Sequence, residues 1–274
     1  MNLEIKELQN FYTKKKLGSF CKRNIGSLIK RNISNIVREN YNQENIVGYG
    51  YPIPYLDNLL KKNSDFLCLM PKNQGASLWP LKKNRSILVE QSEWPLESEI
   101  SNFVIIAHGL ENSDNPSKLL EESWRVLVPE GYLLIIVPNR SGLWARSDLT
   151  PFGFGRPYSV SQLSKLLIDN KFQTSAMSAT LLMPPTENKF LFNSFKFIDQ
   201  IATKYTSKVL CGVLVILAKK QIHLVNTVKI SDSIKVPLEI FVVIKCADEY
   251  FGFFNLIVPF TKLATFSRLR VITP

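Results

Sequence analysis

Residues 103–139 decide the fold, and they read FVIIAHGLENSDNPSKLLEESWRVLVPEGYLLIIVPN. The stretch holds two continuous apolar runs, residues 103–106 and 132–137, as expected of strands buried on both faces of a sheet. Between them, apolar side chains at helical spacing predict a helix over residues 116–128: Leu119, Leu120, Trp124 and Leu127. The Pro129-Glu130-Gly131 turn is predicted to end this helix. A strand, a helix and a strand in this order predict parallel neighbours in an α/β sheet.

The same alternation continues on both sides of this stretch. Further apolar runs predict strands over residues 45–50, 66–70, 86–90, 102–107, 174–182 and 212–217. Helices are predicted over residues 55–62, 159–170 and 195–205. We therefore predict a doubly wound, mostly parallel, Rossmann-like sheet over residues 44–220, with ligands bound at the carboxyl ends of the strands. Residues 221–274 form a predicted C-terminal extension for which the pattern favours no fold.

Residues 1–43 form a separate, basic segment. Residues 1–40 contain nine Lys and Arg against three Glu, so 9 − 3 = +6 of the net +11 charge lies there. An apolar stripe at helical spacing predicts one or two amphipathic helices over residues 11–40, through Leu17, Cys21, Ile25, Leu28, Ile29, Ile33, Ile36 and Val37. Two interpretations stay open. The segment is either a surface for nucleic acid or anionic lipid, or a helix packed on the sheet domain with a solvated basic face.

Composition excludes several classes of protein. The 274 residues are 45% hydrophobic and 21% charged, which is ordinary for a globular protein. Four widely spaced cysteines and two histidines support neither a disulfide framework nor a zinc site, so we expect no metal. No run of 18 residues lacks a charge, so we expect no membrane-spanning helix. Because the N-terminus lacks the pattern of a secretory signal, we expect a cytoplasmic location.

The stretch of residues 103–139 resembles class I AdoMet-dependent methyltransferases, particularly the small-molecule branch with a type 11 methyltransferase domain. Two shorter matches support the resemblance, Arg156-Pro-Tyr158-Ser159 with the helix after it, and Glu90 followed by Pro95. Together they cover residues 44–220. The resemblance implies the class I methyltransferase fold and S-adenosyl-L-methionine (AdoMet) as cofactor.

The cofactor loop departs from the family pattern. The family's first strand ends in an acidic residue before a Gly-x-Gly-x-Gly loop, whereas Gly48, Gly50, Pro52 and Pro54 stand at these positions here. The ribose-binding carboxylate of the family is also absent, and Gln74 follows the second strand instead. The resemblance implies a cofactor site made by Gly48, Gly50, Tyr51, Gln74, Glu90 and Gln91. Three explanations stay open: a variant AdoMet loop, which we favour, a fold that has lost the cofactor, or a different ligand.

Two further groups are candidates for binding or catalysis. His108 ends a predicted strand, where it would serve as general base or position the acceptor; the alternative is a buried histidine bonded to a backbone carbonyl. The loop after residue 137 carries a predicted substrate group, Arg140, Trp144, Arg156 and Tyr158, and arginine among aromatics suits a flat or anionic acceptor. The alternative is a lid that packs on itself.

These features lead to two hypotheses. The first is an AdoMet-dependent methyltransferase that acts on a small or medium-sized acceptor. The second is a non-catalytic binding module of the same fold that uses its basic N-terminal helix on nucleic acid or a membrane surface. The loop of residues 48–54 separates them, because only the enzyme needs it to approach a cofactor.

Overall fold

A computed structural model describes residues 3–40, 45–56, 65–80, 84–188 and 211–222, with the side chains of residues 32–40 and 65 excepted. The chain divides into two units, residues 1–223 and 224–274, and the second lies outside the described residues. The helix predicted over residues 195–205 also lies outside them, as does the C-terminal extension from residue 223 onward.

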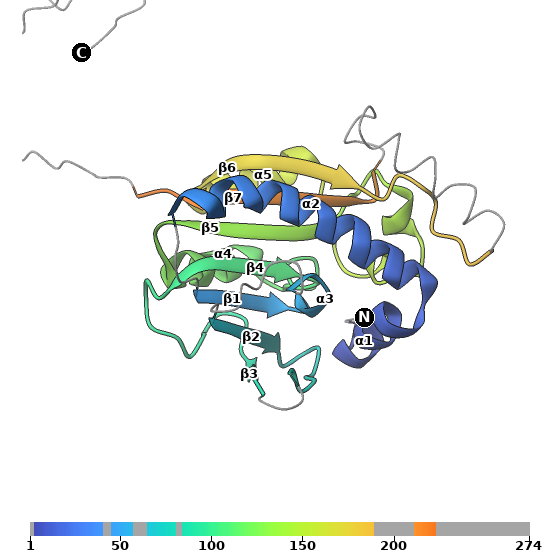
Figure 1. Cartoon of the computed structure of the whole chain (residues 1–274), viewed down its shortest axis with the longest axis horizontal. Coiled ribbons are helices and arrows are strands. Elements are labelled where there is room, and N and C mark those ends of the chain that lie inside the picture. Colours follow the sequence, from blue (N-terminus) through green and yellow to red (C-terminus); the bar gives the residue numbers. More distant parts are fainter. Residues whose placement is uncertain (1–2, 41–44, 57–64, 81–83, 189–210, 223–274) are drawn as a thin grey trace, which may run out of the picture. The chain divides into compact units, whose positions relative to one another are not determined.

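The described strands form one seven-stranded sheet with the order β3-β2-β1-β4-β5-β7-β6 (Figure 1). Their bounds are β1 Asn45–Gly50, β2 Asp65–Pro71, β3 Ser86–Val89, β4 Ser101–Ala107, β5 Leu127–Pro138, β6 Phe172–Thr180 and β7 Val213–Lys220. Strand β7 runs antiparallel to both of its neighbours, while the pairs from β3 to β5 are parallel. This confirms the predicted doubly wound, mostly parallel sheet.

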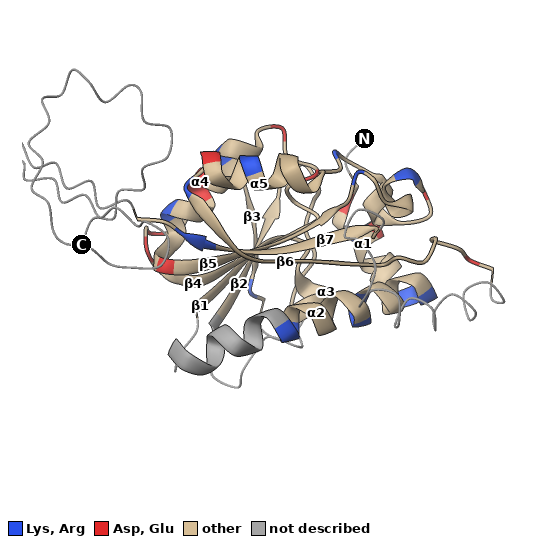
Figure 2. Ribbon diagram, turned by 90° about the horizontal axis from the view of Figure 1, so that it is seen from above, with Lys and Arg blue, Asp and Glu red and all other residues tan. Residues whose placement is uncertain are grey.

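Helices cover both faces of the sheet (Figure 2). One face carries α2 Lys16–Asn40 and α3 Ile53–Leu56, and the other carries α4 Pro116–Val126 and α5 Val160–Asp169. Helix α1 Ile5–Lys14 lies beside the carboxyl ends of β1 and β2 (Figure 1). Two short 3-10 helices, η1 Leu143–Arg146 and η2 Pro151–Gly153, lie in the loop after β5. The sheet therefore separates two apolar cores, one on each face. Among the described helices, none is both long enough and apolar enough to cross a membrane.

The N-terminal segment forms two helices whose apolar side chains are buried against the sheet domain. In α1 the buried side chains are Ile5, Leu8, Phe11 and Tyr12, and in α2 they include Leu17, Cys21, Ile25 and Ile29. Gly18 lets the helices meet closely, because a Cβ there would clash with the carbonyl oxygen of Phe11. The packed-helix interpretation is confirmed for the described side chains, while Ile33, Ile36 and Val37 lie outside them.

The prediction that residues 129–131 form the turn ending the central helix is wrong. Helix α4 ends at Val126, and β5 begins at Leu127 and runs through Pro129 and Gly131. Leu127 is extended because it pairs with Ser101 of β4 and buries its side chain completely. The helix predicted over residues 55–62 begins earlier, as α3 at Ile53, and its part from residue 57 lies outside the described residues.

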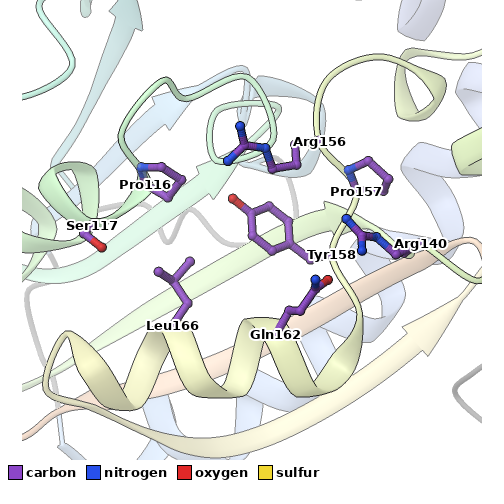
Figure 3. Close-up of a pocket in the computed structure, with 8 residues that line it drawn as sticks. All are labelled: Pro116, Ser117, Arg140, Arg156, Pro157, Tyr158, Gln162 and Leu166. Carbon is purple, nitrogen blue, oxygen red and sulfur yellow. The ribbon is translucent and has the colours of Figure 1, made fainter.

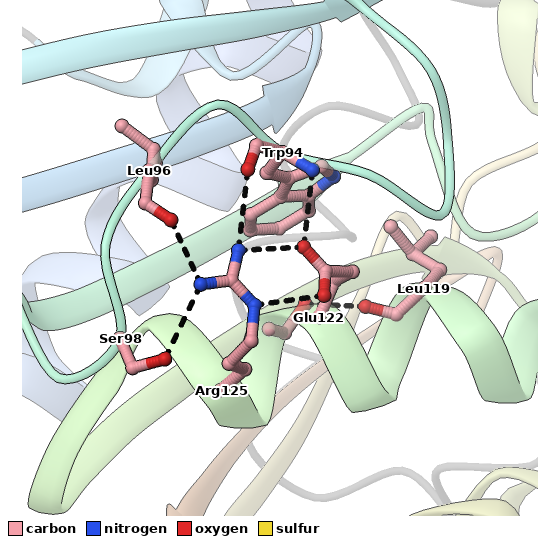
Figure 4. A network of polar contacts seen from close by, with 7 residues as sticks. Trp94, Leu96, Ser98, Leu119, Glu122 and Arg125 are labelled. Carbon is pink, nitrogen blue, oxygen red and sulfur yellow. Dashed lines mark hydrogen bonds and ion pairs between the residues drawn. The ribbon is translucent and has the colours of Figure 1, made fainter.

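Arg125 of α4 holds the loop after β3 against the helix (Figure 4). Its guanidinium donates to the carbonyl oxygens of Leu96, at 2.8 Å, and Trp94, at 3.2 Å, and to the Glu122 carboxylate. The Trp94 amide donates to Glu122 Oε2 at 3.0 Å. Because Arg125 hydrogen-bonds the carboxylate, the pKa of Glu122 lies below its ordinary value. This pair therefore fixes the loop that follows Glu90 and Gln91.

Candidate active site at the carboxyl ends of β1 and β4

The loop after β1 folds tightly across the end of β4. Gly50 has φ +82°, and the Tyr51 amide donates to the Ala107 carbonyl oxygen at 2.7 Å. A Cβ on Gly50 would clash with that same oxygen, so this position requires glycine for both its φ and its close approach. A Cβ on Gly48 would lie 2.5 Å from Pro52 Cγ and 2.8 Å from the Phe66 ring. The proline after the turn therefore occupies the space that a family-type acidic side chain would need.

His108 is the centre of a buried polar cluster. Its backbone has φ 54°, which is uncommon for a residue other than glycine, and its side chain is 1% exposed. The ring Nε2 lies 2.7 Å from the Tyr12 hydroxyl, which lies 2.6 Å from the Tyr55 hydroxyl. On the other side, Nδ1 lies 3.3 Å from Glu111 Oε1. Helix α1, helix α3 and the loop after β4 thus meet at this histidine.

The carboxylate beside His108 favours one arrangement of protons in the cluster. A proton on Nδ1 faces Glu111, which leaves Nε2 to accept from the Tyr12 hydroxyl and Tyr12 to accept from Tyr55. Burial raises the pKa of both Tyr12 and Tyr55 well above the ordinary value, so both hydroxyls keep their protons. Both ring nitrogens of His108 are therefore directed at protein groups.

Several buried acceptor atoms around His108 have no hydrogen-bond donor among the described residues. The side-chain amide groups of Gln74 and Asn112 both donate to the His108 carbonyl oxygen, at 2.9 and 3.1 Å. Their oxygens, Gln74 Oε1 and Asn112 Oδ1, have no hydrogen-bond partner within the described part of the chain. Neither Glu111 oxygen accepts a full hydrogen bond there, and Oε1 has only the 3.3 Å contact with His108 Nδ1. Buried polar atoms are normally paired, so this group of acceptors favours a ligand that carries donors or positive charge.

Helix α1 closes the cluster from outside the sheet. The Ile5 amide donates to the Gln74 carbonyl oxygen at 2.8 Å, and Tyr12 contacts both His108 and Tyr55. The predicted cofactor residue Tyr51 is 3% exposed and stacks on Tyr12, with ring centroids 6.1 Å apart. Burial raises the pKa of Tyr51 to about 12. Of the predicted cofactor residues, Gly50, Tyr51 and Gln74 therefore lie together near His108, while Gly48 lies further back in β1, paired with Ile105 of β4.

The other two predicted cofactor residues lie toward β3. Glu90 is largely exposed, and its Oε1 lies 2.7 Å from Lys72 Nζ at the end of β2. Gln91 holds the loop after β4, because its side chain donates to Ser113 Oγ and the Asn115 carbonyl oxygen. It also accepts from the Asp114 amide at 3.2 Å. Lysine thus stands after the strand where the family carries its ribose-binding carboxylate.

The predicted substrate group divides in two. Arg140, Arg156 and Tyr158 line one pocket at the carboxyl ends of β4 and β5 (Figure 3). Trp144 is fully buried in the core on the α2–α3 face, where its indole donates to the Met183 carbonyl oxygen at 2.6 Å. It packs edge-on against Phe152, which in turn contacts the His108 ring. The middle of this loop therefore packs both on itself, through Trp144 and Phe152, and on the rest of the domain, while its ends form the pocket.

No role was predicted for Tyr12, Glu111 or Asn112. Tyr12 follows Leu8 and Phe11 at helical spacing, so it resembles another core position of α1. Glu111 and Asn112 lie three and four residues after His108, beyond the predicted strand. Their position at a strand end of an α/β sheet is the one signal that could have identified them.

Comparison with known proteins agrees with this fold. Residues 34–135 match the family model described as a methyltransferase domain. A candidate sarcosine dimethylglycine methyltransferase from Galdieria sulphuraria is 13% identical, with a TM-score of 0.50, over 80% of this chain and 92% of its own. The CurJ carbon methyltransferase is 13% identical, with a TM-score of 0.52, over 80% of this chain and 59% of its own. No curated protein matches the sequence significantly.

The sheet order, the helices on both faces and the family match define the class of protein. Residues 34–135 match the model of a methyltransferase domain, and the described residues have the Rossmann-like class I methyltransferase fold. The resemblance carried by residues 103–139 is thereby confirmed.

Proposed function

We propose that this protein is an AdoMet-dependent methyltransferase that acts on a small or medium-sized acceptor. The observation that carries the proposal is the set of unpartnered buried acceptors at the ends of β1, β2 and β4, where class I folds bind ligands. The family match and the fold support it independently. The described cysteines Cys21, Cys68 and Cys211 are buried and in no disulfide, which supports a reducing, cytoplasmic location.

The buried acceptor atoms of the site suit AdoMet chemically. The cofactor carries an ammonium group, a sulfonium and ribose hydroxyls, whereas Gln74 Oε1, Asn112 Oδ1 and the Glu111 carboxylate are all acceptors. A buried carboxylate without a hydrogen bond is costly, so a cationic ligand beside Glu111 offsets that cost. When bound, AdoMet supplies a methyl group made electrophilic by the positively charged sulfur.

The residues of the site would then have separate roles. Gly50 brings the backbone after β1 close to β4, and Gln74, Glu111 and Asn112 would hold the cofactor's charged and hydroxyl groups. His108 would act as a positioning residue, because its ring nitrogens face Tyr12 and Glu111. Helix α1 would exclude water, and it must shift to admit a ligand, since the acceptor atoms are fully buried.

Isothermal titration calorimetry with AdoMet and with S-adenosylhomocysteine tests the proposal on the full chain. Two charged contacts of the family are missing here, so we expect a Kd from micromolar to high micromolar. Glu111→Gln keeps the shape of the side chain and removes its charge, and we expect it to weaken AdoMet binding about tenfold. Glu121→Gln, an exposed position on α4, is the matched control. Absence of heat and of a thermal shift at millimolar AdoMet would contradict the proposal and favour a scaffold that has lost its cofactor.

The second candidate function is binding of nucleic acid or an anionic membrane. It is favoured by the exposed cations of the N-terminal helices, which include Lys14, Lys16, Arg23 and Lys30. Their apolar face is buried against the domain, so only an electrostatic contact is available to this surface. We expect weak binding of duplex DNA or anionic vesicles that disappears as salt increases. Tight binding at physiological salt would favour the binding module instead.

A further inference from the structure

The pocket at the ends of β4 and β5 is formed by the two arms of the loop after β5. The Arg140 amide donates to the Tyr158 carbonyl oxygen at 3.0 Å, and the Tyr158 amide donates to the Pro138 carbonyl oxygen at 3.1 Å. These bonds close the base of the loop and bring Arg140 and Arg156, sixteen residues apart, to one place (Figure 3). The arginine pair is therefore a product of how this loop folds.

The lining of this pocket is rich in donors and contains no acidic side chain. Its eight residues are Pro116, Ser117, Arg140, Arg156, Pro157, Tyr158, Gln162 and Leu166. Neither guanidinium has an ion-pair partner within the described ranges. The Gln162 amide oxygen accepts from the Ser159 amide, which leaves its NH₂ group as a donor. The first turn of α4, at Pro116 and Ser117, adds the positive end of a helix of eleven residues.

Tyr158 forms the buried floor of the pocket. It is 6% exposed, and its hydroxyl points between Pro116 and Arg156 in Figure 3. The hydroxyl donates to the Leu110 carbonyl oxygen at 3.4 Å, and the Arg156 amide donates to the Glu111 carbonyl oxygen at 2.7 Å. The pocket therefore shares the segment Leu110–Glu111 with the buried cluster at His108. Leu166 and the two prolines supply an apolar wall beside the donors.

We propose that this pocket, through Arg140 and Arg156, binds the oxyanion of a small acceptor molecule that carries a carboxylate or phosphate group. The proposal rests on the proposed function for the role of the bound molecule, but not for its binding. Two guanidinium groups that form no ion pair with a protein carboxylate can bind a planar or tetrahedral oxyanion through paired N–H donors. The cavity of about 330 Å³ suits a small molecule, and its position places such a molecule next to the loop that bears His108 and Glu111.

Binding of simple anions tests the site without a cofactor. The full-length protein is titrated with inorganic phosphate and with citrate at constant ionic strength, and binding is followed by calorimetry and by thermal shift. We expect both anions to bind the wild type, and the more strongly bound of the two shows which oxyanion the acceptor carries. Arg140→Gln with Arg156→Gln should weaken binding at least tenfold, since two charge-assisted contacts are lost. Arg146→Gln is the matched control, because Arg146 is exposed in the same loop and does not line the pocket.

Each outcome decides one claim. If the double variant binds phosphate and citrate as the wild type does, or if the wild type binds neither at tens of millimolar, the anion site is wrong. A short DNA duplex that competes through Arg140 and Arg156 and binds far more tightly than citrate would overturn the small-molecule assignment. A protein that binds citrate but not AdoMet keeps the anion site and loses the proposed methyltransferase function, so the two failures are distinguishable.

Discussion

At the scale of single residues, Gly50 at the end of β1 is required by packing and by its backbone conformation, whereas Gly75 after β2 is required by its backbone conformation alone. Gly50 and Gly75 share a φ of +82°, but a Cβ would clash with Ala107 at Gly50 and meets nothing within 4 Å at Gly75. Gly75→Ala should therefore lower the free energy of unfolding by about 1–2 kcal/mol, the cost of the left-handed backbone alone. Gly50→Ala should cost clearly more, measured by urea denaturation of both variants. Equal losses would mean that the loop does not approach β4 as closely as described.

The Tyr12 hydroxyl links helix α1 to the strand ends. Tyr12→Phe leaves His108 Nε2 and the Tyr55 hydroxyl without their buried partner, so we expect a loss of about 1–3 kcal/mol of stability. Tyr132→Phe is the control, because the Tyr132 ring stacks on Phe103 and would remain in place. Denaturant unfolding of the two variants should separate them, and a Tyr12→Phe variant as stable as the control would contradict the cluster.

Glu90 tests the assignment of the cofactor's position, because the resemblance to the family implies that it is the one acidic contact retained. Its carboxylate pairs with Lys72, and an AdoMet molecule bound as the resemblance implies would compete for it. Glu90→Gln and Glu90→Ala should each weaken AdoMet binding by calorimetry, about tenfold. Unchanged affinity in both variants would show that the register assigned after β3 is wrong.

Sequence identified part of the candidate site. His108 and the three predicted residues near it, Gly50, Tyr51 and Gln74, could be predicted because ligands bind at the strand ends of an α/β sheet. Tyr12 was not, because a tyrosine on the buried face of an amphipathic helix looks like core, and its partner lies 96 residues away. Trp144 was predicted in the substrate group, but only the fold shows that its indole is bonded to Met183.

At the scale of elements, the Arg125–Glu122 pair explains how a loop without regular structure is held. The pKa of Glu122 is lowered in the folded protein, so its contribution to stability is present above its ordinary pKa of about 4.5 and is lost as pH falls further. Glu122→Gln should therefore lower stability by about 1 kcal/mol at pH 7, and by much less near pH 3.5. Melting curves of both proteins at the two pH values check this, and a difference that stays constant with pH would contradict it.

Element boundaries show where local patterns lose to tertiary contacts. The apolar runs of β1, β2, β4 and β5 were predicted within one or two residues, except for the start of β5. Leu127 fits the helical spacing of α4 and also fits a strand. It lies in β5 because it pairs with Ser101 of β4. That pairing lies between residues distant in sequence, which the helical periodicity does not report.

At the scale of the whole molecule, the N-terminal helices belong to the domain's core. Deletion of residues 1–38 removes five completely buried apolar side chains, Ile5, Leu8, Cys21, Ile25 and Ile29. A fully buried apolar side chain is worth about 1.5–3 kcal/mol, so the melting temperature should fall by about 10 °C or more. The matched control replaces Lys14, Lys16 and Lys30 with Gln, which removes charge and keeps the apolar face; it should melt like the wild type. A deletion that melts like the full chain would return the segment to the binding-module hypothesis.

The class of fold followed from the sequence, because buried parallel strands and their helices leave a strong apolar pattern. The order of the strands and the antiparallel direction of β7 could not be predicted from the sequence, because they depend on pairings such as that of Pro138 with Val213. The position of α1 over the strand ends could not be predicted either, because it depends on the hydrogen bond between the Ile5 amide and the Gln74 carbonyl oxygen.

The central claim is that AdoMet binds among the residues around His108. Ultraviolet cross-linking of methyl-labelled AdoMet to the full chain, followed by mass spectrometry of its peptides, locates that site directly. We predict label on peptides that contain Tyr12, residues 50–55 or residues 108–112, with protection by excess S-adenosylhomocysteine. Label confined to the loop of residues 140–158, or label that excess S-adenosylhomocysteine does not reduce, would contradict the claim.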